Sequence, residues 1–245
     1  MKSEQYIFAL LATEEVPPLD ELRSFDDTAV TALSFGDLSA IVSDFPEGKL
    51  RPRRANLRVH HLVIDSLIQS GASPLPFSFG TGATEEEIAT LISTNREEFR
   101  SRIEKIRGCV EVSLKLKSKP GELFSLILDA APELARERDL LFLDGREPTR
   151  EEKIMLGQRF DLARTQIQDQ LLGALKDTVQ SVSRDTLTND GGGEELLGEM
   201  ICLVQREESA TFEAAINAVA GQFDDRLVLQ LSPYLAPYSF ADINL

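Results

Sequence analysis

The segment Gly108-Cys109-Val110-Glu111-Val112-Ser113-Leu114-Lys115-Leu116-Lys117 divides the sequence into its two main parts. From Val110 to Lys117, apolar residues alternate with polar ones. A period of two is typical of a β-strand that buries one face and exposes the other. Gly108 ends the helical pattern before it, as glycine commonly does. We therefore expect this segment to be the first strand of a second domain, following an N-terminal domain over residues 1–107.

The N-terminal domain begins with strand patterns. Residues 6–11 form an apolar run too short for a typical helix, and residues 29–34 and 38–43 repeat the strand pattern across a turn at Gly36. A further strand is expected over residues 75–79. Together with the helical patterns between and after them, these strands predict an α+β domain.

The first helix of this domain is expected to begin within residues 51–54 and to end at Gly71. Its apolar stripe consists of Leu57, His61, Ile64 and Ile68. This stripe places His61 at the edge of the core and leaves His60 partly exposed. These are the only two histidines, and adjacent helical residues point about 100° apart, so a shared metal site is not expected.

The turn from Gly80 to Thr84 precedes a second helix. Thr84 and Glu87 have the spacing of a capping box, which predicts one continuous helix as far as Gly108. Glycine-rich turns before helices bind phosphate through backbone N–H groups, but this turn lacks a third glycine and a Gly-Lys-Ser/Thr ending. Glutamates at 85–87 also place negative charge at the helix N-terminus. A tight turn is therefore favoured, and a small-ligand or nucleotide-binding enzyme using this turn is the alternative.

The second domain is expected to cover residues 108–232. After the first strand, the expected elements are a short helix over 122–131, a charged connector, a long helix from the capping box at Thr149 and Glu152 to about residue 184, a turn at 188–193, a strand over 200–204, a helix over 210–223 and a strand over 227–231. The order of strand, long helix, strand, helix and strand predicts a modified ferredoxin-like α/β sandwich.

The chain ends in an apolar, proline-containing tail over residues 233–245. Tyr234, Tyr238 and Phe240 supply three aromatic rings, and Pro233 and Pro237 favour an extended backbone. Aromatic rings on such a backbone are effective anchors in a groove. We expect the tail to dock on the protein's own surface, with binding to a partner as the alternative.

Four blocks of the sequence stand out, in this order: Leu75-Pro-Phe-Ser-Phe-Gly-Thr81, Gly108-Cys-Val-Glu-Val-Ser-Leu-Lys-Leu116, Cys202-Leu-Val-Gln-Arg206 followed by Phe212-Glu-Ala-Ala-Ile216, and Leu231-Ser-Pro-Tyr-Leu-Ala-Pro-Tyr-Ser-Phe240. Together they resemble the GvpF/GvpL family of gas vesicle accessory proteins, and the last block is similar to the family's C-terminal GP-W-x-PPYSF signature. The resemblance implies an accessory or minor structural protein of gas vesicle assembly. It also implies binding to the small hydrophobic shell protein and to other accessory proteins, in the cytoplasm or on the vesicle.

The charge balance narrows the range of partners. Lys and Arg number 26 against 41 Asp and Glu, a formal net charge of −15. Such a field repels phosphate backbones and anionic membrane surfaces, so neither nucleic acid nor a membrane is an expected partner. No apolar run approaches the ~20 residues that span a bilayer. Cys109 and Cys202 lie in apolar strand patterns and are expected to be reduced and buried.

No residues are assigned to catalysis, to a cofactor or to a metal. The histidines have no nearby Ser or Cys at a spacing typical of a nucleophile, and the mixed charges around residues 133–152 are typical of a solvated surface. We therefore expect an interaction protein rather than an enzyme. A ferredoxin-like regulatory module of another assembly remains a further alternative.

Overall fold

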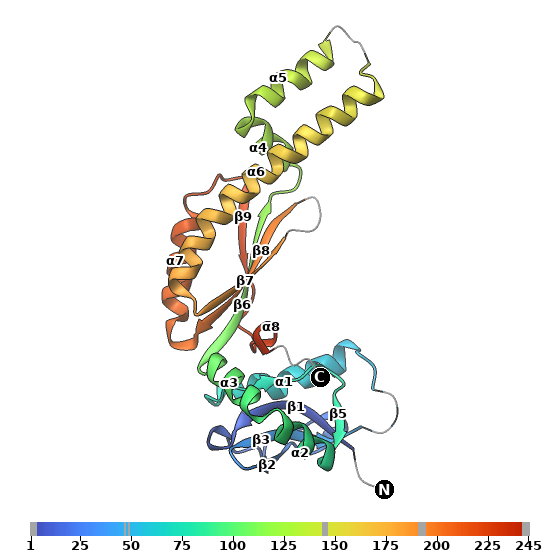
Figure 1. The fold of residues 1–245 in the computed structure, drawn as a ribbon, viewed down its shortest axis with the longest axis vertical. Coiled ribbons are helices and arrows are strands. Elements are labelled where there is room, and N and C mark those ends of the chain that lie inside the picture. Colours follow the sequence, from blue (N-terminus) through green and yellow to red (C-terminus); the bar gives the residue numbers. More distant parts are fainter. Residues whose placement is uncertain (1–3, 47, 49, 144–146, 191–194, 242–245) are drawn as a thin grey trace. The chain divides into compact units, whose positions relative to one another are not determined.

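The computed structural model describes residues 4–46, 48, 50–143, 147–190 and 195–241, and the chain divides into two compact units. Unit 1 consists of Met1–Glu111, Gln205–Glu207 and Tyr234–Leu245, and unit 2 of Val112–Val204 and Glu208–Pro233. Each unit combines helices with an antiparallel sheet (Figure 1). The predicted α+β class is thereby confirmed.

The sheet of unit 1 has the strand order β2-β3-β1-β4, and β5 also pairs with β1. Its strands are β1 (Glu4–Ala12), β2 (Thr31–Phe35), β3 (Leu38–Asp44), β4 (Leu75–Pro76) and β5 (Gly82–Thr84), all in antiparallel pairs. The expected hairpin is confirmed as β2 and β3, which meet in register at Phe35 and Leu38. Gly36 in its turn has a φ of 82°, a value that favours glycine.

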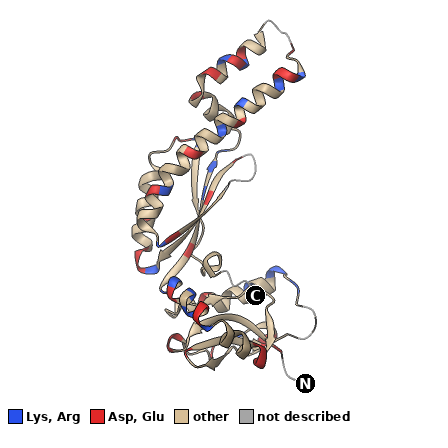
Figure 2. Cartoon of the chain, in the orientation of Figure 1, with Lys and Arg blue, Asp and Glu red and all other residues tan. Residues whose placement is uncertain are grey.

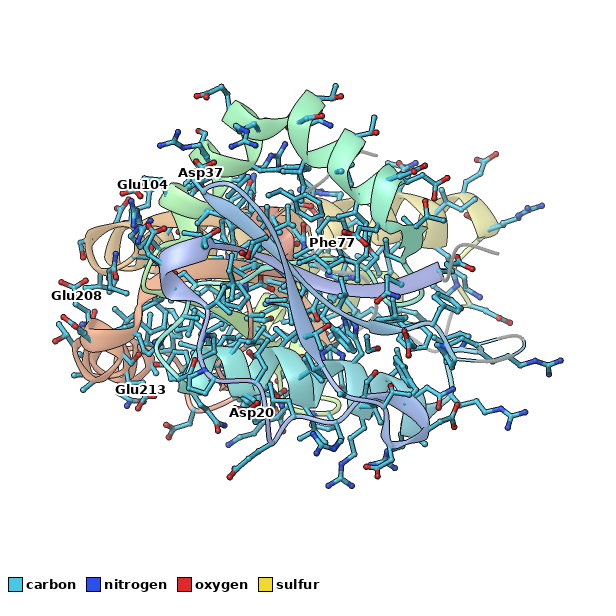
Figure 3. The ribbon with its side chains drawn as sticks, turned by 90° about the horizontal axis from the view of Figure 1, so that it is seen from below. Asp20, Asp37, Phe77, Glu104, Glu208 and Glu213 are labelled. Carbon is cyan, nitrogen blue, oxygen red and sulfur yellow. The ribbon has the colours of Figure 1, made fainter. Side chains whose placement is uncertain are left out.

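Helices cover both faces of this sheet. They are α1 (Arg54–Gln69), α2 (Glu85–Thr94) and α3 (Arg96–Ile106), with a short α8 (Tyr238–Ala241) near the C-terminus. In Figure 3, α1 (cyan) lies on one side of the strands and α2 and α3 (green) on the other, and the labelled Phe77 is buried. Residues 6–12 of β1 are all buried as a result. A strand covered on both faces needs apolar residues on both, which explains its continuous apolar sequence.

The helix predicted from Thr84 to Gly108 is two helices, so that prediction was wrong. The capping box of Thr84 and Glu87 begins α2 as expected, but the chain leaves the helical conformation at Asn95, with φ −112° and ψ 20°. The Asn95 side chain donates a hydrogen bond to the Leu91 carbonyl at 3.0 Å. Asparagine competes with the helical backbone in this way, and the apolar period alone did not reveal the break.

The sheet of unit 2 has the strand order β7-β8-β6-β9. Its strands are β6 (Cys109–Ser118), β7 (Asp185–Asp190), β8 (Leu196–Gln205) and β9 (Leu227–Leu231). The pairs β6–β9 and β7–β8 are antiparallel. Backbone bonds from Ser118 to Glu195 and from Arg206 to Gly108 show that β6 and β8 are antiparallel too. The alternation that predicted β6 is confirmed: Val112, Leu114 and Leu116 are buried.

The helices of unit 2 are α4 (Leu123–Ala130), α5 (Pro132–Leu141), α6 (Arg150–Val182) and α7 (Ser209–Ala220). The capping box of Thr149 and Glu152 starts α6 as predicted. In Figure 1, α6 and α7 lie on the same side of the sheet. Gly198 in β8 permits this packing, because a Cβ there would lie 2.7 Å from the Leu172 side chain of α6.

Two elements of unit 2 were not predicted. The charged connector contains α5. The region assigned to a turn at 188–193 begins with the last residues of β7, 188–190, and residues 191–194 lie outside the described residues. Pro132 at the first turn of α5 is a favourable helix start. The polar sequence of β7 resembles a loop because it is an edge strand of the sheet and Thr188 and Asn189 are exposed.

Candidate functional site

The C-terminal tail contacts unit 1 through backbone and side chain. Leu235 and Glu111 exchange two backbone hydrogen bonds, of 2.8 and 2.9 Å. The Ser239 backbone N–H and hydroxyl donate to the Glu111 carboxylate at 2.7 and 3.0 Å. Partial burial raises the pKa of Glu111, and these two hydrogen bonds oppose that shift. One residue of β6 therefore holds two points of the tail.

Tyr238 inserts its hydroxyl into the interior of unit 1. It lies 3.0 Å from Nε2 of His60, and Nδ1 of the same ring lies 2.9 Å from the hydroxyl of Tyr6. The Gly80 backbone N–H donates to the Tyr6 hydroxyl at 3.1 Å. Burial lowers the pKa of His60 to about 4 and raises that of Tyr6 to about 12, so the imidazole and the phenol are neutral at pH 7.

The placement of the two histidines was predicted the wrong way round. His60 is buried and His61 is exposed. The buried face of α1 consists of His60, Val63, Ile64 and Leu67. Both this stripe and the predicted one have helical spacing, so the spacing alone does not decide which face is buried. The hydrogen bonds of His60 to two tyrosines that are distant in sequence favour burial of the observed face.

The other aromatic residues of the tail differ in burial. Phe240 is buried, with the Lys105 ammonium 5.6 Å from its ring centroid. Arg102 donates a 3.0 Å hydrogen bond to the carbonyl of Ala241. Tyr234 is half-buried. The tail was predicted to be extended, but Tyr238–Ala241 form the short helix α8, so that prediction was wrong for this part; Pro237 fixes a φ that is compatible with the start of a helix. Residues 242–245 of the predicted tail lie outside the described residues.

The glycine turn does not present a set of open N–H groups for a phosphate. Gly80 N–H is bonded to Tyr6, Thr81 N–H to the Ser78 carbonyl, and Thr84 N–H to the Glu87 carboxylate. Gly82 belongs to β5, and a Cβ there would lie 2.5 Å from the Phe45 ring. The close packing of β5 against the Phe45 side chain thus explains why this position is a glycine.

A polar cavity of about 420 Å³ lies beside α3 in unit 1. Its lining includes Asp37 and Glu104, which Figure 3 labels, together with Arg100 and Arg107. Arg100 pairs with Asp37 at 3.2 Å, and Arg107 pairs with Glu15 and Glu104. Since these arginines are already neutralised, we assign no ligand to the cavity.

Other kinds of site find no support in the described residues. Among them, no three or more His, Cys, Asp or Glu side chains converge as metal ligands, and no helix has the length and hydropathy to cross a membrane. Cys109 and Cys202 are buried, as expected, and neither forms a disulfide.

An apolar surface on α4–α6 of unit 2 was not anticipated. Of the eleven large apolar side chains that are exposed among the described residues, seven lie in α4–α6 or directly after α5, the region here called the α4–α6 surface: Phe124, Leu140, Phe142, Leu143, Ile154, Met155 and Leu162. Between α5 and α6 lies a groove of about 440 Å³, lined by Glu137, Leu140, Leu141, Glu152, Met155, Leu156 and Arg159. The signal in the sequence was present: Ile154, Met155 and Leu162 fall outside the apolar stripe of the long helix.

Comparisons with known proteins agree over nearly the whole chain. Residues 4–242 match the family described as gas vesicle synthesis protein GvpL/GvpF. Gas vesicle protein F of Nostoc sp. is 22% identical over all of both chains, and that of Dolichospermum flosaquae is 22% identical over 94% of each. The crystal structure of GvpF from Anabaena sp. has a TM-score of 0.88 at 21% identity and covers 99% of this chain and 100% of its own. The structure of GvpF from Microcystis aeruginosa has a TM-score of 0.80 at 22% identity and covers 98% of this chain and 100% of its own. With four blocks in family order and a match over residues 4–242, this chain belongs to the GvpL/GvpF family of gas vesicle synthesis proteins.

Proposed function

We propose that this protein acts in gas vesicle formation as a non-catalytic accessory protein that binds the small hydrophobic shell protein and works with other accessory proteins. Family membership supports the role in gas vesicle formation. We infer that it works in the cytoplasm and on the growing vesicle, without a cofactor.

The observation that carries this proposal is the apolar surface on α4–α6. Large apolar side chains exposed together on a folded protein mark an interaction site more often than scattered ones do. Leu140 and Met155, which flank the groove between α5 and α6, are 68% and 62% exposed. A groove between two helices suits an apolar helix of a partner, and a small hydrophobic shell protein supplies apolar segments of that kind.

Co-expression with the shell protein tests the proposal. The tagged chain is expected to co-purify with it, and the complex is expected to persist when salt is raised, because apolar contacts are not screened. Failure to co-purify under conditions where another family member does so would contradict direct binding.

For the tail, we propose an intramolecular clasp. The contacts of Tyr238 with His60 and of Phe240 with Lys105 support docking on the chain's own unit 1, and Tyr234 contributes its half-buried ring. Binding of the tail to a partner is the less favoured interpretation, because release would expose Phe240 and separate Tyr238 from His60.

We also propose that residues 1–107 and 108–232 form two domains, followed by a docked tail over 233–245. Two observations support a ferredoxin-like fold for the second domain. Along the chain its elements follow the order strand, helices, two strands, helix and strand, and in the sheet its strands follow the order β7-β8-β6-β9. The bonded N–H groups of the glycine turn disfavour the enzyme alternative.

A further inference from the structure

Four arginines gather at the start of α1, in the segment Arg51-Pro-Arg-Arg-Ala-Asn-Leu-Arg58. Arg51, Arg53, Arg54 and Arg58, here called the arginine cluster, are all exposed. None of them forms an ion pair with a carboxylate of the described residues. Figure 2 shows the blue of this cluster at that end of α1. A concentrated positive charge with no ion-pair partner among the described residues is unexpected in a chain with a net charge of −15.

The arginine cluster is unfavourable for the helix that carries it. The N-terminus of a helix favours negative charge, yet the first turn of α1 contains no acidic residue and its N-cap, Arg53, makes no side-chain cap. Arg54 and Arg58 are four residues apart and repel each other along one face. The starts of α2 and α6, by contrast, have complete capping boxes and acidic first turns. Folding therefore does not account for these arginines.

The backbone presents the arginine cluster in a fixed arrangement. The Asn56 side chain donates to the Arg51 carbonyl at 2.9 Å, and Arg53 N–H donates to the same carbonyl at 2.7 Å. Leu50, just before the cluster, packs against the core of unit 1. A partner would thus meet guanidinium groups on an ordered scaffold, which lowers the entropic cost of binding.

An apolar residue extends the same surface. Arg54, Arg58 and Leu62 are spaced four residues apart, which places them along one stripe of α1. Leu62 is 52% exposed, whereas Val63, Ile64 and Leu67 on the other face are buried. The stripe therefore offers positive charge followed by an apolar contact.

We propose that the arginine cluster together with Leu62 is a docking surface for an acidic segment of a partner protein that also carries an apolar side chain. Guanidinium groups bind carboxylates through paired hydrogen bonds, and charge complementarity steers the approach. Extended polyanions such as nucleic acid or an anionic membrane would also meet the acidic remainder of the chain, which favours a short acidic segment. This surface lies on unit 1 and is separate from the α4–α6 surface proposed for the shell protein.

The test uses the full chain and a fluorescent synthetic peptide helix with glutamates and leucines on one face, followed by anisotropy. The wild type is expected to bind it, more weakly as salt rises. Arg54→Gln with Arg58→Gln is expected to weaken binding about tenfold or more, since two charge-assisted contacts are lost. The double variant Arg51→Gln with Arg53→Gln is likewise expected to weaken binding of the peptide. Both residues precede the first helical turn, so this variant leaves the residues of the helix unchanged. Leu62→Ala is expected to weaken binding a few-fold.

The matched control is Arg136→Gln with Arg150→Gln, which removes two exposed arginines from unit 2 and is expected to leave binding unchanged. The melting temperature of the Arg54 and Arg58 variant is expected to match or exceed that of the wild type, because an unfavourable charge has been removed.

The proposal is overturned if the wild type does not bind the peptide at low salt, or if both double variants of the cluster bind the peptide as the wild type does. It is equally overturned if anionic vesicles or duplex DNA bind more tightly than the peptide. The arginine-cluster variants are also tested for co-purification with the shell protein, which they are expected to retain. Failure of the docking-surface proposal can in this way be distinguished from failure of the proposed function.

Discussion

The hydroxyl of Tyr238 lies 3.0 Å from Nε2 of His60, so a residue of the C-terminal segment completes a hydrogen-bonded chain that begins at Gly80 and Tyr6. His60 has one tyrosine hydroxyl at each ring nitrogen. Buried polar groups of this kind stabilise a structure only when all are bonded. The tail therefore satisfies a group in the centre of unit 1.

Tyr238→Phe is expected to destabilise the protein by about 1–3 kcal/mol, since it leaves the buried imidazole without one partner. Urea unfolding of Tyr238→Phe, His60→Gln and the double variant measures the coupling of the two residues. A coupling of about 1 kcal/mol or more is expected for groups in contact. Strictly additive effects would mean that the hydrogen bond contributes nothing to stability.

Stability is expected to fall as the pH decreases from about 6.5 to about 4. His60 has a pKa of about 4 in the folded chain against 6.5 when unfolded, so the unfolded chain binds the proton first in this window. The slope from this group is at most about 1.4 kcal/mol per pH unit. Burial also raises the pKa values of Glu111 and Asp65, so these two carboxyl groups bind protons more readily in the folded chain and oppose the effect of His60 as the pH falls toward their ordinary pKa values. The comparison with His60→Gln isolates the histidine: the variant is expected to have a shallower slope, and an equal slope would contradict this assignment.

Removal of residues 233–245 is expected to lower the melting temperature by several degrees. Burying an aromatic ring contributes on the order of 1.5–3 kcal/mol, and ordering the segment offsets part of this. Circular dichroism of the truncated chain measures the shift. An unchanged melting temperature with loss of shell-protein binding would instead make the tail a partner-binding peptide.

Two glycine substitutions are expected to act in opposite directions. Gly82→Ala places a Cβ 2.5 Å from the Phe45 ring and is expected to cost about 1–3 kcal/mol through overpacking. Gly157→Ala, in α6 with no neighbour within 4 Å, is expected to stabilise by up to about 1 kcal/mol. Denaturant midpoints of both variants check this. A neutral Gly82→Ala would show that packing against Phe45 does not constrain this position of β5.

Much of the fold was predictable from local pattern. The alternation of β6, the apolar run of β1 and the two capping boxes each specify an element without reference to the rest of the chain. The break at Asn95 and the polar edge strand β7 were missed, because their signals depend on a single side chain and on position within the sheet.

The candidate sites were less predictable because they depend on contacts between distant residues. His60 and Tyr238 are separated by 178 positions, and only their contact reveals which face of α1 is buried. The α4–α6 surface and the arginine cluster did have signals in the sequence, namely apolar residues off the helical stripe and four arginines within eight positions. Their significance depends on how exposed the side chains are and, for the arginines, on the absence of ion-pair partners in the part of the chain that the structure describes. The sequence pattern alone gives neither.

The most direct test of the proposed function is co-purification of the shell protein with a surface variant. Leu140→Ser with Met155→Ser removes two exposed side chains beside the groove and is expected to leave folding intact, because neither is buried. Its control is Leu187→Ser with Val228→Ser, which removes two exposed apolar residues from the sheet of the same unit. We expect the first pair to abolish co-purification and the control to retain it. Undiminished co-purification by the Leu140 and Met155 variant, with its fold intact, would contradict the α4–α6 surface as the binding site.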